Sequence, residues 1–258
     1  MTAHPPGTPC WFDLGSPDLD ESVAFYGGLF GWEAAEVGDG YRALTLDGKA
    51  VGGLGPKEAP GRPYWTMYVA VDDVDATAAV ATAAGATVVV PPTDIPGVAR
   101  MAMFNGIEGE PFSIWRPAPS GGADIAGQVE PPGYFRWFEL TCREVDAQVA
   151  FYSEVFGWVP DPVDEGVGYL SFHLADRTPV AGLLPMRGEH WPGPDVLPAH
   201  WMLYVAVADT DAAATRAKEL GGEVAVPPTD IPPGRFAVLN DPHGAVFSVI
   251  EPPAGGPG

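Results

Sequence analysis

The sequence is poor in positive charge, and it contains no long apolar run. Its 258 residues include 13 Lys and Arg against 34 Asp and Glu, which gives a formal net charge of -21. A surface this acidic repels phosphate backbones and anionic lipid, so we expect no nucleic-acid partner and no membrane partner. The most apolar stretch, residues 78–90, is interrupted by Gly85 and is too short to cross a bilayer.

Cysteine is also scarce. The two cysteines, Cys10 and Cys142, fall one in each half of the chain, which excludes a disulfide framework and indicates a reducing compartment. The N-terminal residues have neither a basic segment nor an apolar core, so no signal peptide is expected. The sequence therefore favours a cytoplasmic protein.

An aromatic motif occurs twice and organises the rest of the chain. Residues 25–32 read Phe-Tyr-Gly-Gly-Leu-Phe-Gly-Trp, and residues 151–158 read Phe-Tyr-Ser-Glu-Val-Phe-Gly-Trp. Around both copies, apolar side chains recur at spacings of four, three and four, which places them on one face of a helix. Gly31 and Gly157 then end the helix. Further segments repeat in the same order, so the chain is a tandem duplication; they are residues 65–71 with 201–207 and residues 91–96 with 227–232.

A strand, a helix and three short strands are predicted to follow one another twice in each half. In the first half the two helices begin near Asp18 and Asp72 and end before Gly31 and Gly85. Residues 117–133 are rich in Pro, Gly and Ala and show no periodicity, so the halves divide there. We predict an α+β fold of four βαβββ units, in two modules at residues 9–118 and 133–252 with a linker at residues 119–132.

This order of elements resembles the vicinal oxygen chelate superfamily. The motifs that carry the resemblance are Asp-Leu-Asp-Glu-Ser-Val-Ala-Phe-Tyr at residues 18–26 and Phe-Gly-Trp at residues 30–32. The superfamily includes glyoxalase I, the extradiol dioxygenases and the bleomycin-resistance proteins, and the chain is most similar to its tandem glyoxalase-like or "hydroxylase" branch. The resemblance implies deep, U-shaped sheets whose concave faces hold the ligand. It implies no particular reaction, because one fold hosts many functions.

Metal-dependent members of the superfamily place three ligands on the concave face, in the first, fifth and last strands. By the resemblance, these places are Trp11, Thr66 and Ser113 in the first module, and Trp137, Met202 and Ser248 in the second. Neither set makes a divalent-metal site, so we expect both modules to have lost the metal and to use no cofactor. Glyoxalase I and extradiol chemistry are therefore disfavoured, because both use the ion as a Lewis acid.

Each module also directs one carboxylate to that face. Asp13 alternates with Trp11 and Glu139 with Trp137, so each carboxylate is a candidate acid or base. A structural ion pair or hydrogen bond with a nearby Arg or Tyr is the competing interpretation.

The second module has two histidines predicted on the same face as Glu139. They are His173 and His200, and two His with one carboxylate form a metal-binding set. A displaced metal site is therefore an alternative; the other is that the three residues are unconnected.

Aromatic residues alternate onto the predicted concave faces, where they suit flat apolar ligands by stacking. The competing interpretation is that these large side chains fill the cavities. The predicted ligand-binding residues are Trp11, Tyr41, Tyr64, Thr66, Tyr68, Ser113 and Trp115 in the first module, and Trp137, Tyr169, Met202, Tyr204 and Ser248 in the second.

The second half is ten residues longer than the first between the helix motif and the strand near residue 201. Most of the extra length lies in residues 186–200, a Pro-rich loop that contains His190 and Trp191. Such a loop beside a cavity strand is either a lid or inert.

The sequence predicts a glyoxalase/bleomycin-resistance-like protein that binds a small aromatic or apolar metabolite without a metal. The alternative is an enzyme, a lyase, isomerase or hydroxylase-like oxidoreductase, that uses Asp13 or Glu139 as acid or base, or a metal at Glu139, His173 and His200. A structural role with no small ligand is a third reading. Because the duplication already supplies four units, we expect a monomer or a weak dimer.

Overall fold

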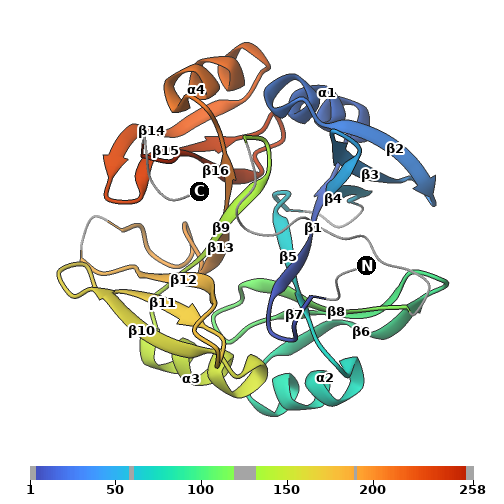
Figure 1. Ribbon diagram of the computed structural model, residues 1–258, viewed down its shortest axis with the longest axis vertical. Coiled ribbons are helices and arrows are strands. Elements are labelled where there is room, and N and C mark those ends of the chain that lie inside the picture. The colour runs from blue at the N-terminus through green and yellow to red at the C-terminus, as the bar shows by residue number, and fades with distance from the viewer. Residues whose placement is uncertain (1–3, 58–60, 119–131, 189–190, 254–258) are drawn as a thin grey trace. The chain divides into compact units, whose positions relative to one another are not determined.

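The computed structural model describes residues 4–57, 61–118, 132–188 and 191–253. The predicted linker lies outside these residues except for Pro132. Within the described ranges the order βαβββ occurs four times, which confirms the α+β fold of two similar modules (Figure 1). The first-half elements are β1 (Pro9–Ser16), α1 (Leu19–Phe30), β2 (Glu33–Gly38), β3 (Tyr41–Leu46), β4 (Lys49–Pro56), β5 (Trp65–Ala70), α2 (Val74–Ala83), β6 (Thr87–Ile95), β7 (Ala99–Asn105) and β8 (Pro111–Pro117). The second-half elements are β9 (Phe135–Cys142), α3 (Val145–Phe156), β10 (Val159–Asp164), β11 (Tyr169–His173), β12 (Pro179–Pro185), β13 (His200–Ala206), α4 (Thr210–Glu219), β14 (Glu223–Ile231), β15 (Gly234–Asn240) and β16 (Val246–Glu251).

Each half of the sequence forms one eight-stranded sheet. The strand orders are β2-β3-β4-β1-β5-β8-β7-β6 and β10-β11-β12-β9-β13-β16-β15-β14, so the second sheet repeats the first. Within the sheets β1 runs parallel to β4 and β5 to β8, as β9 does to β12 and β13 to β16. The register is also repeated: Asp13 lies opposite Gly53, and Glu139 lies opposite Gly182.

The contacts divide the chain into two compact units, and each unit takes segments from both halves of the sequence. Of the described residues, unit 1 takes 4–11, 66–118, 138–188 and 191–201, and unit 2 takes 12–57, 61–65, 132–137 and 202–253. Helices α2 and α3 contact each other in unit 1, and α1 and α4 do so in unit 2 (Figure 1). A helix of one module is therefore always partnered by a helix of the other.

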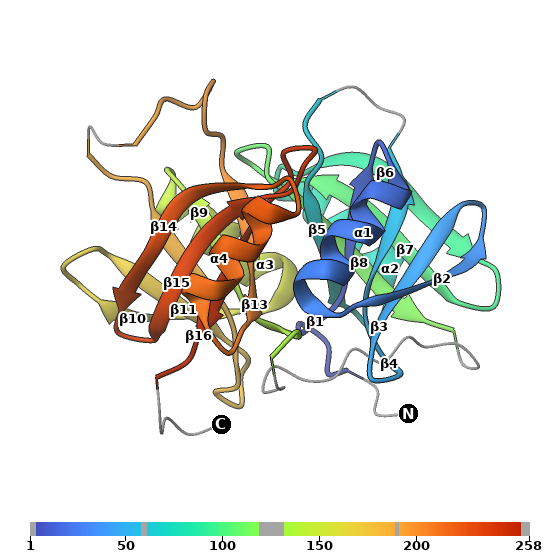
Figure 2. The same ribbon diagram turned by 90° about the horizontal axis from the view of Figure 1, so that it is seen from above.

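Helix α4 shows how the helices lie on their strands. It packs on β14, β15 and β16 of its own half (Figure 2). Its buried residues are Thr210, Ala214 and Ala217, at spacings of four and three, and their small side chains allow close approach to the sheet. None of the helices in the described part of the chain is long and apolar enough to cross a membrane.

The aromatic motif of α1 forms the core of unit 2. The Tyr26 ring is fully buried and stacks on Trp32, with ring centroids 5.7 Å apart. It meets Trp65 edge to face at 5.3 Å and lies 5.6 Å from Phe247, which comes from the second half of the sequence. Gly31, at φ 77°, ends the helix between the tyrosine and the tryptophan that stacks on it.

The Tyr26 hydroxyl has two partners inside this core. It accepts a hydrogen bond from Trp65 Nε1 at 3.0 Å and donates one to Asp241 Oδ2 at 3.1 Å. The carboxylate of Asp241 also accepts the backbone N–H groups of His243 and Ala245. Burial raises the pKa of Asp241 above its ordinary value, while these hydrogen bonds act in the opposite direction.

Unit 1 contains the same chain of hydrogen bonds built from the other copies. Tyr152 is fully buried, stacks on Trp158, accepts from Trp201 Nε1 at 3.1 Å and donates to Glu110 Oε1 at 3.1 Å. Burial raises the pKa of Glu110, as it does for Asp241. In each unit the tyrosine therefore donates to a carboxylate of the other module.

The two carboxylates come from different positions of equivalent turns. In one turn the N–H of Gly106 donates to the carbonyl of Glu110, and in the other the N–H of Asp241 donates to the carbonyl of Ala245. Gly106 thus takes the place of Asp241, and Glu110 takes the place of Ala245. A Cβ added at Gly106 would overlap the Glu110 carboxylate, so the two arrangements put an acid into the same space from opposite ends of the turn.

Several sequence predictions need correction at strand ends. The predicted order requires a strand after α3, and this strand is β10; its residues were not assigned from the sequence, because Val159–Asp164 contains two prolines and shows little alternation. Strands β6 and β14 continue through Pro91-Pro92 and Pro227-Pro228; both are edge strands, and the prolines lie where the register with β7 and β15 shifts. Strand β5 begins at Trp65, so Tyr64 lies just before the strand and is 46% exposed.

Candidate functional site

The predicted ligand face of the first module contributes a compact aromatic group to unit 1. Tyr68 lies opposite Ser113 in the β5–β8 pairing, and its ring meets Trp115 edge to face at 5.7 Å. Thr66 and Trp11 are also buried in this unit. The hydroxyl of Ser113 is fully buried and has no hydrogen-bond partner among the described residues, which is unusual for a buried polar group.

The corresponding face of the second module contributes an apolar cluster to unit 2. Met202, Tyr204 and Ile250 form its buried centre, and none of them is more than 8% exposed. The Ser248 hydroxyl lies opposite Tyr204 and, like Ser113, is buried without a partner among the described residues. The residues packed against the cluster are Trp137, Phe236, Val238 and Val246. The side chains of this face therefore pack on one another.

Asp13 and Tyr41 form a hydrogen-bonded pair in unit 2. The Tyr41 hydroxyl donates to Asp13 Oδ1, and both residues are partly exposed. The pair lies on the backbone of Gly53, where an added Cβ would collide with the Tyr41 hydroxyl and come within 2.9 Å of Asp13 Oδ1. Glycine at this position is therefore what allows the tyrosine to reach the carboxylate.

The polar residues predicted for the second module lie in unit 1, but they are not brought together as a metal site. Glu139 is 8% exposed, and Ser171 on β11 is buried as well. His173 has Nδ1 3.1 Å from the Arg177 carbonyl and Nε2 4.0 Å from Asp161. His200 has Nδ1 2.9 Å from the Pro198 carbonyl.

No group of three His, Cys, Asp or Glu side chains in the described part of the chain could hold a metal ion. Glu139, His173 and His200, the alternative set, do not form such a group. The positions that the resemblance implies for the metal ligands carry Trp, Thr and Ser in one module and Trp, Met and Ser in the other. The donor chemistry of these side chains does not fit a divalent ion.

The two cysteines do not contribute a nucleophile to either site. Burial raises the pKa of the Cys10 thiol far above its ordinary value and that of Cys142 to about 12. A thiol reacts as the thiolate, so both groups are inert at neutral pH.

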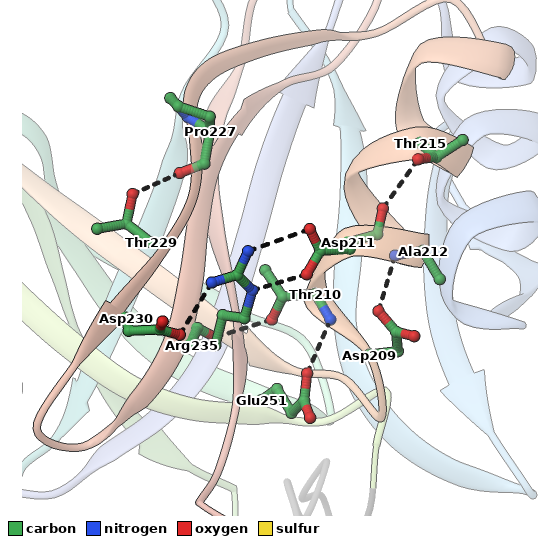
Figure 3. Close-up of polar contacts among 10 residues, drawn as sticks. All are labelled: Asp209, Thr210, Asp211, Ala212, Thr215, Pro227, Thr229, Asp230, Arg235 and Glu251. Carbon is green, nitrogen blue, oxygen red and sulfur yellow. Dashed lines mark hydrogen bonds and ion pairs between the residues drawn. The ribbon is translucent and has the colours of Figure 1, made fainter.

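A separate polar cluster joins α4 to the β14–β15 hairpin (Figure 3). The Arg235 guanidinium binds both oxygens of Asp211 and one oxygen of Asp230. Arg100 does the same with Asp75 and Asp94 in the first module. Because the clamp occurs at equivalent places and the carboxylates already engage each guanidinium, we interpret it as an anchor for the helix start rather than as a ligand site.

Sequence reasoning missed two contacts of the candidate residues. The Asp13–Tyr41 pair depends on Gly53, and a glycine inside a predicted strand is the signal that could have indicated a close approach there. The hydrogen bond that holds His200 depends on the loop before it, and no sequence pattern points to it.

Comparison with known families agrees with this architecture. Residues 10–114 match the Glyoxalase/Bleomycin resistance protein/Dioxygenase superfamily, and residues 137–250 match a family described as a glyoxalase-like domain. Similar solved structures include the Mn(II)-bound glyoxalase from Novosphingobium aromaticivorans, with a TM-score of 0.63 and 22% identity over 95% of this chain and 82% of that one. Another is the 2,2',3-trihydroxybiphenyl 1,2-dioxygenase from Sphingomonas wittichii, with a TM-score of 0.64 and 16% identity over 96% of this chain and 91% of that one. At these identities the likeness shows the fold alone.

Two relatives are similar along nearly their whole length. The anthracycline biosynthesis protein DnrV of Streptomyces peucetius is 41% identical over 273 residues, which cover 97% of this chain and 95% of the relative. The putative glyoxylase CFP32 of Mycobacterium bovis is 36% identical over 261 residues, which cover 95% of each chain. The chain therefore belongs to the glyoxalase/bleomycin resistance protein/dioxygenase superfamily, with two glyoxalase-like modules in tandem.

Proposed function

We propose that this protein binds a flat, polycyclic aromatic metabolite without the help of a metal. The donor chemistry at the superfamily metal positions carries the proposal. Thr66 and Ser113 offer only hydroxyls, and Met202 and Ser248 offer a thioether and a hydroxyl, none of which suits a divalent ion. Aromatic and apolar side chains dominate both faces, and such linings favour planar apolar ligands.

The relatives support the chemical class of the ligand. Anthracyclines are fused-ring aromatic compounds, and the relative from Streptomyces peucetius is named for their biosynthesis. We infer that the ligand of this chain has the same general form, a planar ring system with polar substituents. The unpartnered hydroxyls of Ser113 and Ser248 lie on the predicted ligand faces and match such substituents.

Metal content and ligand binding test the proposal together. Protein purified without a His-tag should contain less than about a tenth of an equivalent of any transition metal, and adding Mn(II), Zn(II), Ni(II) or Fe(II) should leave its melting temperature unchanged. A metal present at 100 times its dissociation constant would stabilise the fold by about 2.7 kcal/mol, which is easily measured. The probe 2-hydroxyanthraquinone should quench tryptophan fluorescence saturably. One tightly bound metal equivalent, or no binding of the probe, would contradict the proposal.

A second candidate function is an enzyme that uses Asp13 as acid or base. The observation in its favour is the hydrogen bond from Tyr41, which fixes the carboxylate on a rigid three-strand frame. Turnover of a hydroxylated aromatic compound that is lost in D13N, while the bound probe retains its affinity, would support catalysis. A probe recovered unchanged after long incubation would support binding alone.

A further inference from the structure

His200 stands at the end of the segment that lengthens the second half, and its ring is held in one orientation. The imidazole Nδ1 lies 2.9 Å from the carbonyl oxygen of Pro198. A carbonyl oxygen can only accept a hydrogen bond, so Nδ1 carries the proton. When the ring is neutral, Nε2 is therefore a bare lone pair.

Arg143 fixes the loop that presents this carbonyl. Its Nη1 donates to the carbonyl of Leu197 at 2.9 Å, and its Nη2 donates to the carbonyl of Pro192 at 2.5 Å. Its own backbone N–H is bound by the Glu108 carboxylate, 3.1 Å away. The Leu197–Pro198 segment is thus tied to the junction of β9 and α3.

The surroundings also keep the His200 ring neutral. Burial lowers the pKa of His200 below its ordinary value of 6.5; the hydrogen bond with the Pro198 carbonyl opposes this, and the positive charge of Arg143 adds to the lowering. No hydrogen bond to its Nε2 comes from any residue in the described ranges, and the side chain is only partly buried. With Nδ1 bound to the Pro198 carbonyl, Nε2 of this partly buried ring is left as a hydrogen-bond acceptor.

We propose that His200 Nε2 accepts a hydrogen bond from an acidic hydroxyl of the ligand, of the phenol or enol class. Arg143 is the positioning residue that holds the ring through the Leu197–Pro198 segment. The assignment rests on the proposed function, because it states how the aromatic metabolite is oriented. The first module has Tyr64 at the equivalent place, which is 46% exposed and lies outside its strand, so the acceptor belongs to the second module alone.

The protonation state of the ring tests the geometry without any ligand. Long-range proton–nitrogen correlation spectra of 15N-labelled protein at pH 7 should show His200 protonated at Nδ1 and bare at Nε2, with the signal assigned by its absence in H200Q. In R143Q the ring should lose this fixed form and show a mixture of the two neutral tautomers. The signal of His243, which lies 3.3 Å from Glu21 in unit 2, should stay unchanged as an internal control. A ring protonated at Nε2 in the wild type would overturn the proposal.

A pair of probes tests the role in binding. Wild-type protein should bind 2-hydroxyanthraquinone about tenfold more tightly than 2-methoxyanthraquinone, the size of effect expected for one lost hydrogen bond. H200F should bind both compounds equally. If the wild type binds both compounds with equal affinity, the role of His200 is wrong while the proposed function stands. If it binds neither, both are overturned.

Discussion

The two turns that supply the buried carboxylates predict that one substitution, G106D, has opposite effects on stability in the wild type and in the E110A variant. E110A removes the acceptor of the Tyr152 hydroxyl and of the Glu108 N–H, which lie 3.1 and 3.0 Å from its oxygens. Each lost hydrogen bond to a buried carboxylate costs about 1–3 kcal/mol, and relief of the carboxylate's own desolvation offsets part of this. We expect E110A to lower the free energy of unfolding by about 2–4 kcal/mol, which corresponds to roughly 5–15 °C in melting temperature.

The rescue is the informative part of this experiment. G106D in the wild type forces a second acid into the space that Glu110 fills, so it should destabilise the protein. G106D in the E110A background recreates the arrangement of Asp241 and Ala245 on a turn with the same backbone hydrogen bonds, so it should restore more than half of the lost stability. Urea unfolding of the four proteins, followed by circular dichroism, gives the coupling between the two positions. A double variant no more stable than E110A would refute the claim that the turns are interchangeable.

Three further outcomes follow from the structure. Burial raises the folded-state pKa of Asp241 above its unfolded value, so the protonated acid is favoured on folding. The stability that wild type holds relative to D241N should be fully present below the unfolded pKa of about 4 and should fall as pH rises through the folded pKa, as measured by unfolding at each pH. G53A should destabilise the fold by about 1–3 kcal/mol and displace Tyr41. The control G55A should change the melting temperature little, because its Cβ would meet only a Tyr41 ring carbon at 3.6 Å. Similar losses of stability in both variants would contradict the role of Gly53. The effect of R235A on melting temperature should be small and should shrink in 1 M salt, because the clamp is solvent-exposed; an effect that salt leaves unchanged would contradict this.

The sequence was sufficient for the elements and their order because the signals are local. The helix motif has a strong apolar period, Gly31 and Gly157 end both copies, and the duplication gave each prediction a second test. The residues of strand β10 could not be assigned, because prolines interrupt its alternation. The edges of the fold are thus less predictable than its repeated centre.

The candidate site was less predictable, because its contacts join segments far apart in the chain. Alternation placed Asp13 on the same face as Trp11, but the partner Tyr41 depends on strand pairing and on a glycine between them. The buried acids were invisible to repeat comparison, since Gly106 aligns with Asp241 and Glu110 aligns with Ala245. The two modules supply the buried carboxylate from different positions of the turn, so aligning one module with the other does not reveal that the two acids have the same role.

The exchange of carboxylates between modules has a consequence for how the halves fold. Tyr26 needs Asp241 and the ring of Phe247, and Tyr152 needs Glu110 and the ring of Phe112. A half expressed alone would bury a tyrosine hydroxyl with no acceptor and leave one wall of each aromatic core open to water. Such a half can complete itself only by pairing with its counterpart or with a second copy of itself. Because both halves belong to one polypeptide, each half meets its counterpart in an intramolecular step at high effective concentration. Folding is therefore independent of protein concentration.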